Sequence, residues 1–271
     1  MIRELLYGLY ERQLERRVRA GVVPRHVGVI LDGNRRFARR MGYAQITDGH
    51  RRGADKVDEL VGWCNELGVP IVTLWALSTD NLGRQPEELT AIFELIERKV
   101  EAFSRDHEGA HQRRVRVVGR RELLPESTRA AIERAEEATA DSGPDELLVA
   151  IGYGGREEIT DAVRRMLADR IRRGDSLEGI VDDLEPDEIS RYLYAPDIPD
   201  PDLIIRTSGE LRLSGFLLWQ SAYSEYYFCD VFWPDFRRID FLRALRSYAS
   251  RQRRLSRAGS RRGASRATTS R

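Results

Sequence analysis

The sequence predicts a single α/β domain with a mainly parallel central sheet flanked by helices. Short β-branched or apolar runs alternate with longer segments whose apolar residues recur at helical spacing, which is the pattern of strand–helix–strand units. Polar loops follow several of the apolar runs. The chain has 271 residues, of which 41% are hydrophobic and 33% charged, so one domain can bury a substantial core.

The elements follow one another in a regular order. Residues 2–19 form an amphipathic pattern, and we expect this helix to pack on the domain rather than on a membrane surface. Expected strands are 27–30, 71–77, 115–118, 147–151, 202–206 and 226–228, and expected helices are 53–67, 86–103, 125–140, 157–171 and 241–248. We therefore divide the chain into an N-terminal helix (1–23), a main domain (24–255) and a basic, disordered tail (256–271).

A charged loop follows the first expected strand. It contains Asp32, Gly33, Asn34, Arg35 and Arg36. Open α/β sheets bind ligands at the carboxyl ends of their strands. Each arginine can donate two parallel hydrogen bonds to phosphate oxygens. The aspartate can bind a divalent cation whose remaining ligands come from the same phosphates. The local sequence fits a solvent-exposed turn as well as it fits a ligand-binding loop, because turns favour the same residue types.

A second basic cluster follows the strand 202–206. Arg206 and Arg212 lie there with Ser214. Two separate arginine clusters indicate two polyanionic ligands, and a cation would offset the repulsion between two diphosphates.

Several blocks along the chain then resemble one known family. They are residues 32–37, 49–50, 77–81, 152–156, 205–214, 216–220 and 223–225. In this order they resemble the signature of the cis-prenyltransferases, the Z-type prenyl diphosphate synthases, over about residues 24–255. The resemblance implies that the main domain is catalytic and condenses isopentenyl diphosphate with an allylic prenyl diphosphate, using Mg²⁺. It also implies a homodimer and a hydrophobic tunnel along the helix that begins near Pro86.

The resemblance assigns roles to individual residues. Asp32 is expected to engage Mg²⁺ and the allylic diphosphate, and Glu225 to help hold the metal from the neighbourhood of a partner subunit. Asn81, with Ser78, is expected to orient the substrate or assist proton removal. Gly33, Asn34, Arg35 and Arg36 are expected around the allylic diphosphate, with His50 and Arg84 nearby. Further substrate-binding residues are expected at Phe37, Thr79, Asp80 and Leu82.

The isopentenyl diphosphate site is expected at Arg206, Arg212 and Ser214, and Leu213 is expected to be a further substrate-binding residue. His50 has a second interpretation as a surface residue of a polar loop.

The residues that bear on product length point in two directions. Ile46 and Leu82 depart from the long-chain pattern, and with the N-terminal segment they resemble actinobacterial short-chain members that make Z,E-farnesyl diphosphate from geranyl diphosphate. Ala76, however, leaves the start of the tunnel open, so Phe93 or Ile96 would have to limit growth. The alternative is a long-chain decaprenyl or undecaprenyl diphosphate synthase that makes a cell-wall lipid carrier.

Three other functional classes fit the sequence less well. Non-catalytic accessory subunits of cis-prenyltransferases generally lose the first-loop aspartate and basic pair, which this chain keeps. Residues 152–156 match a dinucleotide fingerprint only in part, because Glu157 stands where a third glycine belongs. The acidic stretch near Asp182 is better explained as solvated than as a trans-prenyltransferase motif.

Charge and cysteine usage bear on location. Eight of the 45 basic residues and none of the 44 acidic residues lie within 251–271. A solvated tail and attraction to anionic lipid headgroups both fit this segment, whereas nucleic-acid binding has no aromatic platform behind it.

No apolar run reaches the roughly 20 residues of a membrane span, no signal peptide is recognisable, and the two cysteines are isolated. We expect a cytoplasmic protein, with peripheral contact at the inner face of the cell membrane as the extended hypothesis.

Overall fold

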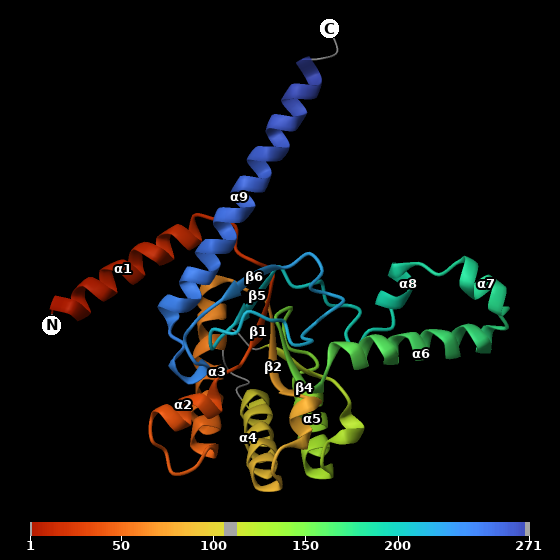
Figure 1. Cartoon of the computed structure of the whole chain (residues 1–271), viewed down its shortest axis with the longest axis horizontal. Helices are drawn as coiled ribbons and strands as arrows, with labels where there is room; N and C mark the ends of the chain where they lie inside the picture. Colours follow the sequence, from red (N-terminus) through yellow and green to blue (C-terminus); the bar gives the residue numbers. More distant parts are fainter. Residues whose placement is uncertain (1, 106–112, 269–271) are drawn as a thin grey trace.

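A six-stranded, wholly parallel sheet forms the centre of the molecule (Figure 1). The computed structural model describes the backbone of residues 2–105 and 113–268 and the side chains of 7–105 and 113–254. The strand order is β3-β4-β2-β1-β5-β6. The strands are β1 (His26–Ile30), β2 (Ile71–Ser78), β3 (Arg114–Val118), β4 (Glu146–Tyr153), β5 (Leu203–Arg206) and β6 (Glu225–Phe228). The α/β prediction is confirmed.

The strand order creates a crevice between β1 and β5. From β1 the chain proceeds to β2 on one side, and it later returns to place β5 on the other side of β1. Loops that leave two neighbouring parallel strands in opposite directions open such a crevice at the carboxyl edge. The loops carrying Asp32 and Arg206 meet at this point.

Both faces of the sheet are covered. Along β4, Leu147, Val149 and Ile151 enter the core with the helices, whereas Leu148 and Ala150 enter a second cluster with Phe216. This alternation is the period-two pattern of a strand buried on both sides. Residues of α3 (Thr47–Leu67), α4 (Pro86–Arg105), α5 (Glu126–Ala138) and α9 (Arg238–Thr268) join the first cluster.

The N-terminal helix α1 (Ile2–Arg19) packs against α9, as expected. Leu14 and Val18 are buried there, and Arg238 of α9 forms ion pairs with Glu11 at 2.9 Å and Glu15 at 3.1 Å. The exposed Leu9 lies outside this contact.

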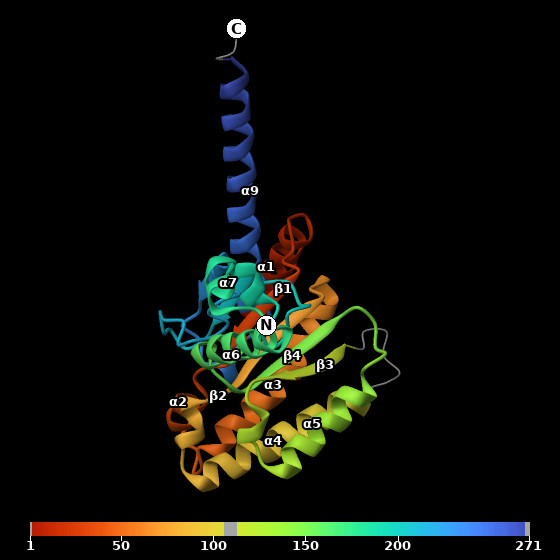
Figure 2. The ribbon, with the colours of Figure 1, turned by 90° about the vertical axis from the view of Figure 1, so that its right-hand side faces the viewer.

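Helix α9 continues through residues 256–268, where the sequence predicted a disordered tail. Its C-terminal part projects away from the body (Figures 1 and 2). Arg and Ala favour helical backbone, but a helix without packing partners is marginal in water. Side chains beyond Arg254 lie outside the described ones, so disorder of this tail stays a prediction.

Some helices were not expected from the sequence. The segment after Asp32 contains a helix, α2 (Asn34–Arg40), and α3 begins at Thr47 rather than at residue 53. Helix α2 is too short to show a periodic pattern. After α6 (Gly155–Arg173), the short helices α7 (Leu177–Asp182) and α8 (Pro186–Ser190) occupy the acidic stretch. Of the helices described here, none is both long and apolar enough to cross a membrane.

Candidate active site

A polar cavity of about 440 Å³ lies at the carboxyl edge of the sheet, beyond β1, β2 and β5. Most of the predicted site residues line it. The predicted residues in its wall are Asp32, Gly33, Asn34, Arg35, Arg36, His50, Ser78, Asp80, Asn81, Arg84, Arg206 and Ser214. Arg39, Trp75 and Ala76 also contribute. The described lining contains five arginines and two aspartates, so the cavity suits a polyanion.

Thr207 joins the loops that follow β1 and β5. Its buried hydroxyl donates to the Asp32 carbonyl oxygen at 2.7 Å and accepts from the Asp32 N–H at 3.0 Å. Gly33 then turns the chain with φ of 110°, and a Cβ there would lie 2.9 Å from the Phe232 ring. Position 33 therefore requires glycine, both for its backbone angle and for the close contact.

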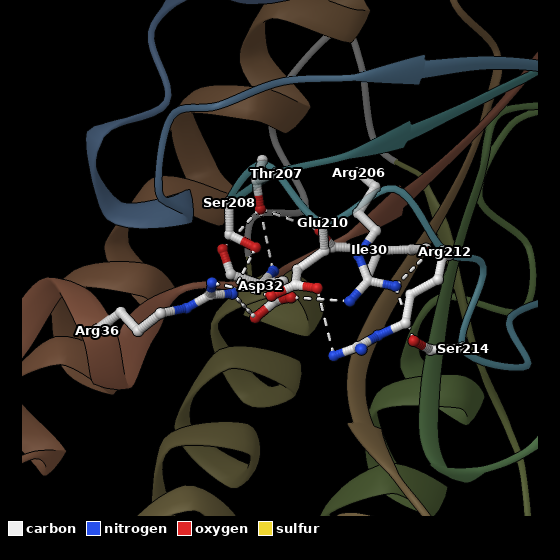
Figure 3. A network of polar contacts seen from close by, with 9 residues as sticks. All are labelled: Ile30, Asp32, Arg36, Arg206, Thr207, Ser208, Glu210, Arg212 and Ser214. Carbon is white, nitrogen blue, oxygen red and sulfur yellow. Dashed lines mark hydrogen bonds and ion pairs between the residues drawn. The ribbon is translucent and has the colours of Figure 1, made fainter.

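Two arginines from different elements, Arg36 of α2 and Arg206 at the end of β5, hold the Asp32 carboxylate (Figure 3). Arg206 Nη2 donates to Asp32 Oδ2 at 2.9 Å, and Arg36 Nη2 donates to Asp32 Oδ1 at 3.3 Å. Arg206 Nη1 also donates to Ser214 Oγ at 2.7 Å and to the Arg212 carbonyl. The carboxylate is thereby fixed at the cavity wall between two guanidinium groups.

These contacts decide the ionisation of Asp32. Burial by itself would raise its pKa, but hydrogen bonds from Arg206 and Ser208 and the nearby Arg36 charge outweigh burial and lower the pKa below its ordinary value. Asp32 is therefore an anion at neutral pH.

Ser208 and Glu210 complete this network, and neither was named as a site residue from the sequence. Arg36 donates to Ser208 Oγ at 2.7 Å and to Glu210 Oε1 at 3.1 Å. Both belong to the 205–214 block, which was the available signal.

A second carboxylate, Glu88, organises the opposite wall of the cavity. It accepts from His50 Nε2 at 2.9 Å and from Arg84 Nη1 at 3.0 Å, and Arg35 Nε lies 3.6 Å away. Burial lowers the pKa of His50 against the opposing pull of Glu88. His50 is thus nearly buried in the site and is not a surface residue. Glu88 was missed, although its i,i+4 spacing from Arg84 was a usable signal.

Three buried polar atoms of the lining have no hydrogen-bond partner among the described residues. They are Arg206 Nε, Arg84 Nε and Asn34 Oδ1. An orphaned buried donor costs about 1–3 kcal/mol, and native structures rarely leave one without a function. Two of the three are guanidinium N–H groups, which select an oxyanion.

Six of the predicted residues, Glu225 included, lie outside the described lining. Phe37 is buried against Tyr43, with ring centroids 5.8 Å apart. Thr79 and Leu82 belong to the turn beside the cavity, where the Leu82 N–H donates to the Thr79 carbonyl at 3.1 Å. The Arg212 side chain is exposed and pairs with Glu210 at 3.3 Å, and Leu213 is half-buried next to it. Arg212 reaches the network through its carbonyl oxygen instead.

Glu225 lies at the other end of the sheet from Asp32. It pairs in register with Leu203 at the amino end of β5, and its carboxylate binds Arg251 at 2.5 Å. Asp32 follows the carboxyl end of β1. The two carboxylates therefore cannot share a metal ion within one chain, and only a Glu225 from a second copy could meet Asp32.

The polar cavity adjoins a smaller, apolar compartment of about 90 Å³ between α3, α4 and the sheet. The two share Leu31, Asn34, His50, Ala76 and Ile92. Further apolar lining comes from Ala54, Val57, Leu74, Leu95, Ile96, Val100, Phe103, Val149 and Trp233. Ile96 thus lines the compartment as expected, whereas Phe93 packs into the neighbouring core.

The donor set fits Mg²⁺ in one way only. Among the residues that the structure describes, no group of three His, Cys, Asp or Glu side chains could hold a metal by itself. Asp32 supplies one hard carboxylate at the cavity wall. Mg²⁺ is commonly bound by one or two carboxylates together with substrate phosphates and waters, so the residues fit an ion that is held jointly with a diphosphate.

Comparison with known proteins decides the family. Residues 30–256 match the family described as "Putative undecaprenyl diphosphate synthase". The chain belongs to the undecaprenyl diphosphate synthase family. This confirms the resemblance, and the chain is a prenyltransferase, since its relatives carry isoprenyl transferase and prenyl diphosphate synthase names.

This chain aligns with individual relatives over nearly its whole length. It is 56% identical over 255 residues to a (2Z,6E)-farnesyl diphosphate synthase of Thermobifida fusca, covering 94% of this chain and 98% of that protein. It is 53% identical over 253 residues to an isoprenyl transferase of Thermus thermophilus, covering 93% and 96%. A tritrans,polycis-undecaprenyl-diphosphate synthase (geranylgeranyl-diphosphate specific) of Methanopyrus kandleri is 51% identical over 260 residues, covering 93% and 92%.

A solved structure shares the fold. Lavandulyl diphosphate synthase from Lavandula x intermedia, in complex with dimethylallyl diphosphate, superposes with a TM-score of 0.78 at 31% identity. The match covers 84% of this chain and 95% of that one. The relatives differ in product length, so this family member's product does not follow from similarity.

Proposed function

We propose that this prenyltransferase condenses isopentenyl diphosphate with geranyl diphosphate to give Z,E-farnesyl diphosphate. The observation that carries the proposal is one continuous site with an arginine-rich mouth and a short apolar interior. The mouth suits diphosphates, and the interior suits a hydrocarbon chain of limited length. The volume of the apolar compartment, about 90 Å³, is well below the roughly 300–1,000 Å³ of pockets that bind drug-sized ligands.

The residues of the mouth would act on the leaving group. Heterolysis of the allylic C–O bond releases diphosphate, and the π electrons of isopentenyl diphosphate then form the new C–C bond, after which a proton is lost. Arg36 and Arg84 stabilise the negative charge that grows on the departing diphosphate, whereas Arg206 binds the diphosphate of isopentenyl diphosphate. Mg²⁺ bound at Asp32 would neutralise part of the same charge. Asn81 and Ser78 lie at the cavity wall, where they can orient the attacking substrate.

The apolar compartment would hold the hydrocarbon. It excludes water from the electron-deficient carbon, since most of its described lining is apolar, including Ala76 and Ile92 next to the polar cavity. Its small volume favours the short product over a long-chain lipid carrier. The Thermobifida fusca relative supports this choice, and the Methanopyrus kandleri relative supports the alternative.

Product analysis tests the proposal. Purified protein is incubated with labelled isopentenyl diphosphate, Mg²⁺ and geranyl diphosphate, and the dephosphorylated products are separated by chromatography. A single fifteen-carbon alcohol is expected. A ladder reaching about fifty carbons would replace the proposal by the long-chain alternative, and no turnover without a partner chain would favour an accessory subunit.

A further inference from the structure

Lys99 is the one lysine or arginine in the described lining of the apolar compartment. Its position on α4 places it between Ile96 and Phe103, which both line the same compartment. The side chain is 22% exposed, and its ammonium binds the carboxylate of Asp58 on α3. The apolar stem thus faces the compartment while the charged end reaches a wetter position, which is how lysine usually meets an apolar surface.

The ion pair spans the two helices that enclose the compartment. Ala54 and Val57 of α3 face Ile92 and Ile96 of α4 across it, and Asp58 follows directly on α3. A chain that advances between the helices meets the Lys99 stem and then the paired charges. Packing of a hydrocarbon against an ammonium group costs free energy, because it removes water from the charge and supplies no hydrogen-bond acceptor in its place.

The distance along α4 matches a short product. Glu88 marks the diphosphate end through His50 and Arg84, and Lys99 lies eleven residues further on the same helix. At about 1.5 Å per residue the separation along the axis is about 16 Å. An extended chain advances about 1.2 Å per bond, since three backbone bonds span 3.3–3.6 Å, so the main chain of a farnesyl group reaches about 14 Å. A fourth isoprene unit would reach Lys99.

We propose that the Lys99–Asp58 ion pair is the barrier that ends chain growth in this enzyme. The proposal rests on the short-chain function proposed above and names the residues that set it. Stopping growth does not need a large barrier, because a tenfold preference for release over another addition corresponds to about 1.4 kcal/mol.

The test compares product lengths of matched variants. Lys99→Met keeps the stem and removes the charge, and Asp58→Asn removes the partner. Arg98→Leu is the control, since Arg98 is the exposed neighbour on α4 and lies outside the compartment. All are assayed with excess isopentenyl diphosphate, and the Michaelis constants of both substrates are measured.

We expect Lys99→Met to raise the ratio of products longer than fifteen carbons by about tenfold or more, with Michaelis constants within twofold of the wild type. Asp58→Asn should shift the ratio in the same direction by less, and Arg98→Leu should leave it unchanged. Unchanged products in Lys99→Met would overturn the proposal, even if Lys99→Ala lengthens them, because the stem alone would then be the barrier.

The wild-type product separates the two proposals. If the wild type makes fifteen-carbon product and Lys99→Met does the same, the barrier proposal fails and the short-chain function stands. If the wild type itself makes long products, the short-chain function has failed, and Lys99 is no barrier.

Discussion

Replacing Arg206 by alanine should be more damaging than replacing Arg212, although both belong to the same predicted cluster. Arg206 is 5% exposed and contacts Asp32, Ser214 and the Arg212 carbonyl, and its Nε atom has no described partner. The Arg212 side chain is exposed and reaches only Glu210. Truncation of Arg206 therefore removes a buried charge that faces the ligand.

The magnitude follows from these contacts. A charge-assisted hydrogen bond contributes about 1.5–3 kcal/mol, so loss of one such bond to a diphosphate lowers kcat/KM about 10- to 150-fold. Asp32 would also lose its 2.9 Å partner, which raises its pKa toward the ordinary value. The effect should be largest in the Michaelis constant for isopentenyl diphosphate.

The assay varies each substrate at saturating concentration of the other. Arg212→Ala is the control, and its exposed side chain predicts a change of less than about fivefold. Arg206→Lys reports on the fork geometry, since lysine keeps the charge but not the paired donors. Equal effects of Arg206→Ala on both substrates, or equal effects of the two alanine variants, would refute this account of the site.

Two further predictions concern buried titratable groups. Glu88→Gln removes the carboxylate that holds His50 and Arg84, so the Michaelis constant for the allylic primer should rise about tenfold; an unchanged constant in steady-state assays would show that this wall does not position the primer. Burial lowers the pKa of His26 from 6.5 to about 4. The unfolded chain therefore takes up a proton that the folded one does not. His26-linked stability is complete above about pH 6.5 and falls by about 3 kcal/mol as the pH drops to about 4. Urea unfolding should show that His26→Gln lacks this part of the pH dependence, and identical pH profiles would contradict the assignment.

The sequence predicted the sheet and much of the cavity because both follow from local patterns. Strand runs such as 147–151 carry their burial in composition, and residues at the ends of parallel strands must share one edge, which brings Asp32 and Arg206 together. The sequence did not reveal the contacts between residues that are far apart along the chain. Arg36 contacts Ser208 across 172 residues, and His50 contacts Glu88 across 38 residues, so only the pairing of Glu88 with Arg84 at i,i+4 had a local signal.

The predicted residues that lie outside the cavity lining have physical reasons for their positions as well. Phe37 and Leu82 stand in recognisable blocks, but Phe37 packs on Tyr43 and Leu82 packs against the core instead of lining the cavity. Glu225 begins β6 and so lies at the amino edge, although its block adjoins that of Arg206 in sequence. A motif predicted which segments lie near the cavity. Whether a given side chain points into the cavity depended on the helix, turn or strand that carries it.

We propose that Asp32, together with Arg36 and Arg84, promotes the ionisation of the allylic diphosphate. The most direct test of this role is single-turnover product formation by Asp32→Asn in saturating Mg²⁺, with circular dichroism to show that the fold is intact. Asparagine keeps the shape and one acceptor oxygen but removes the charge. The account predicts a loss of about 10²- to 10³-fold in rate. A rate close to that of the wild type would contradict it.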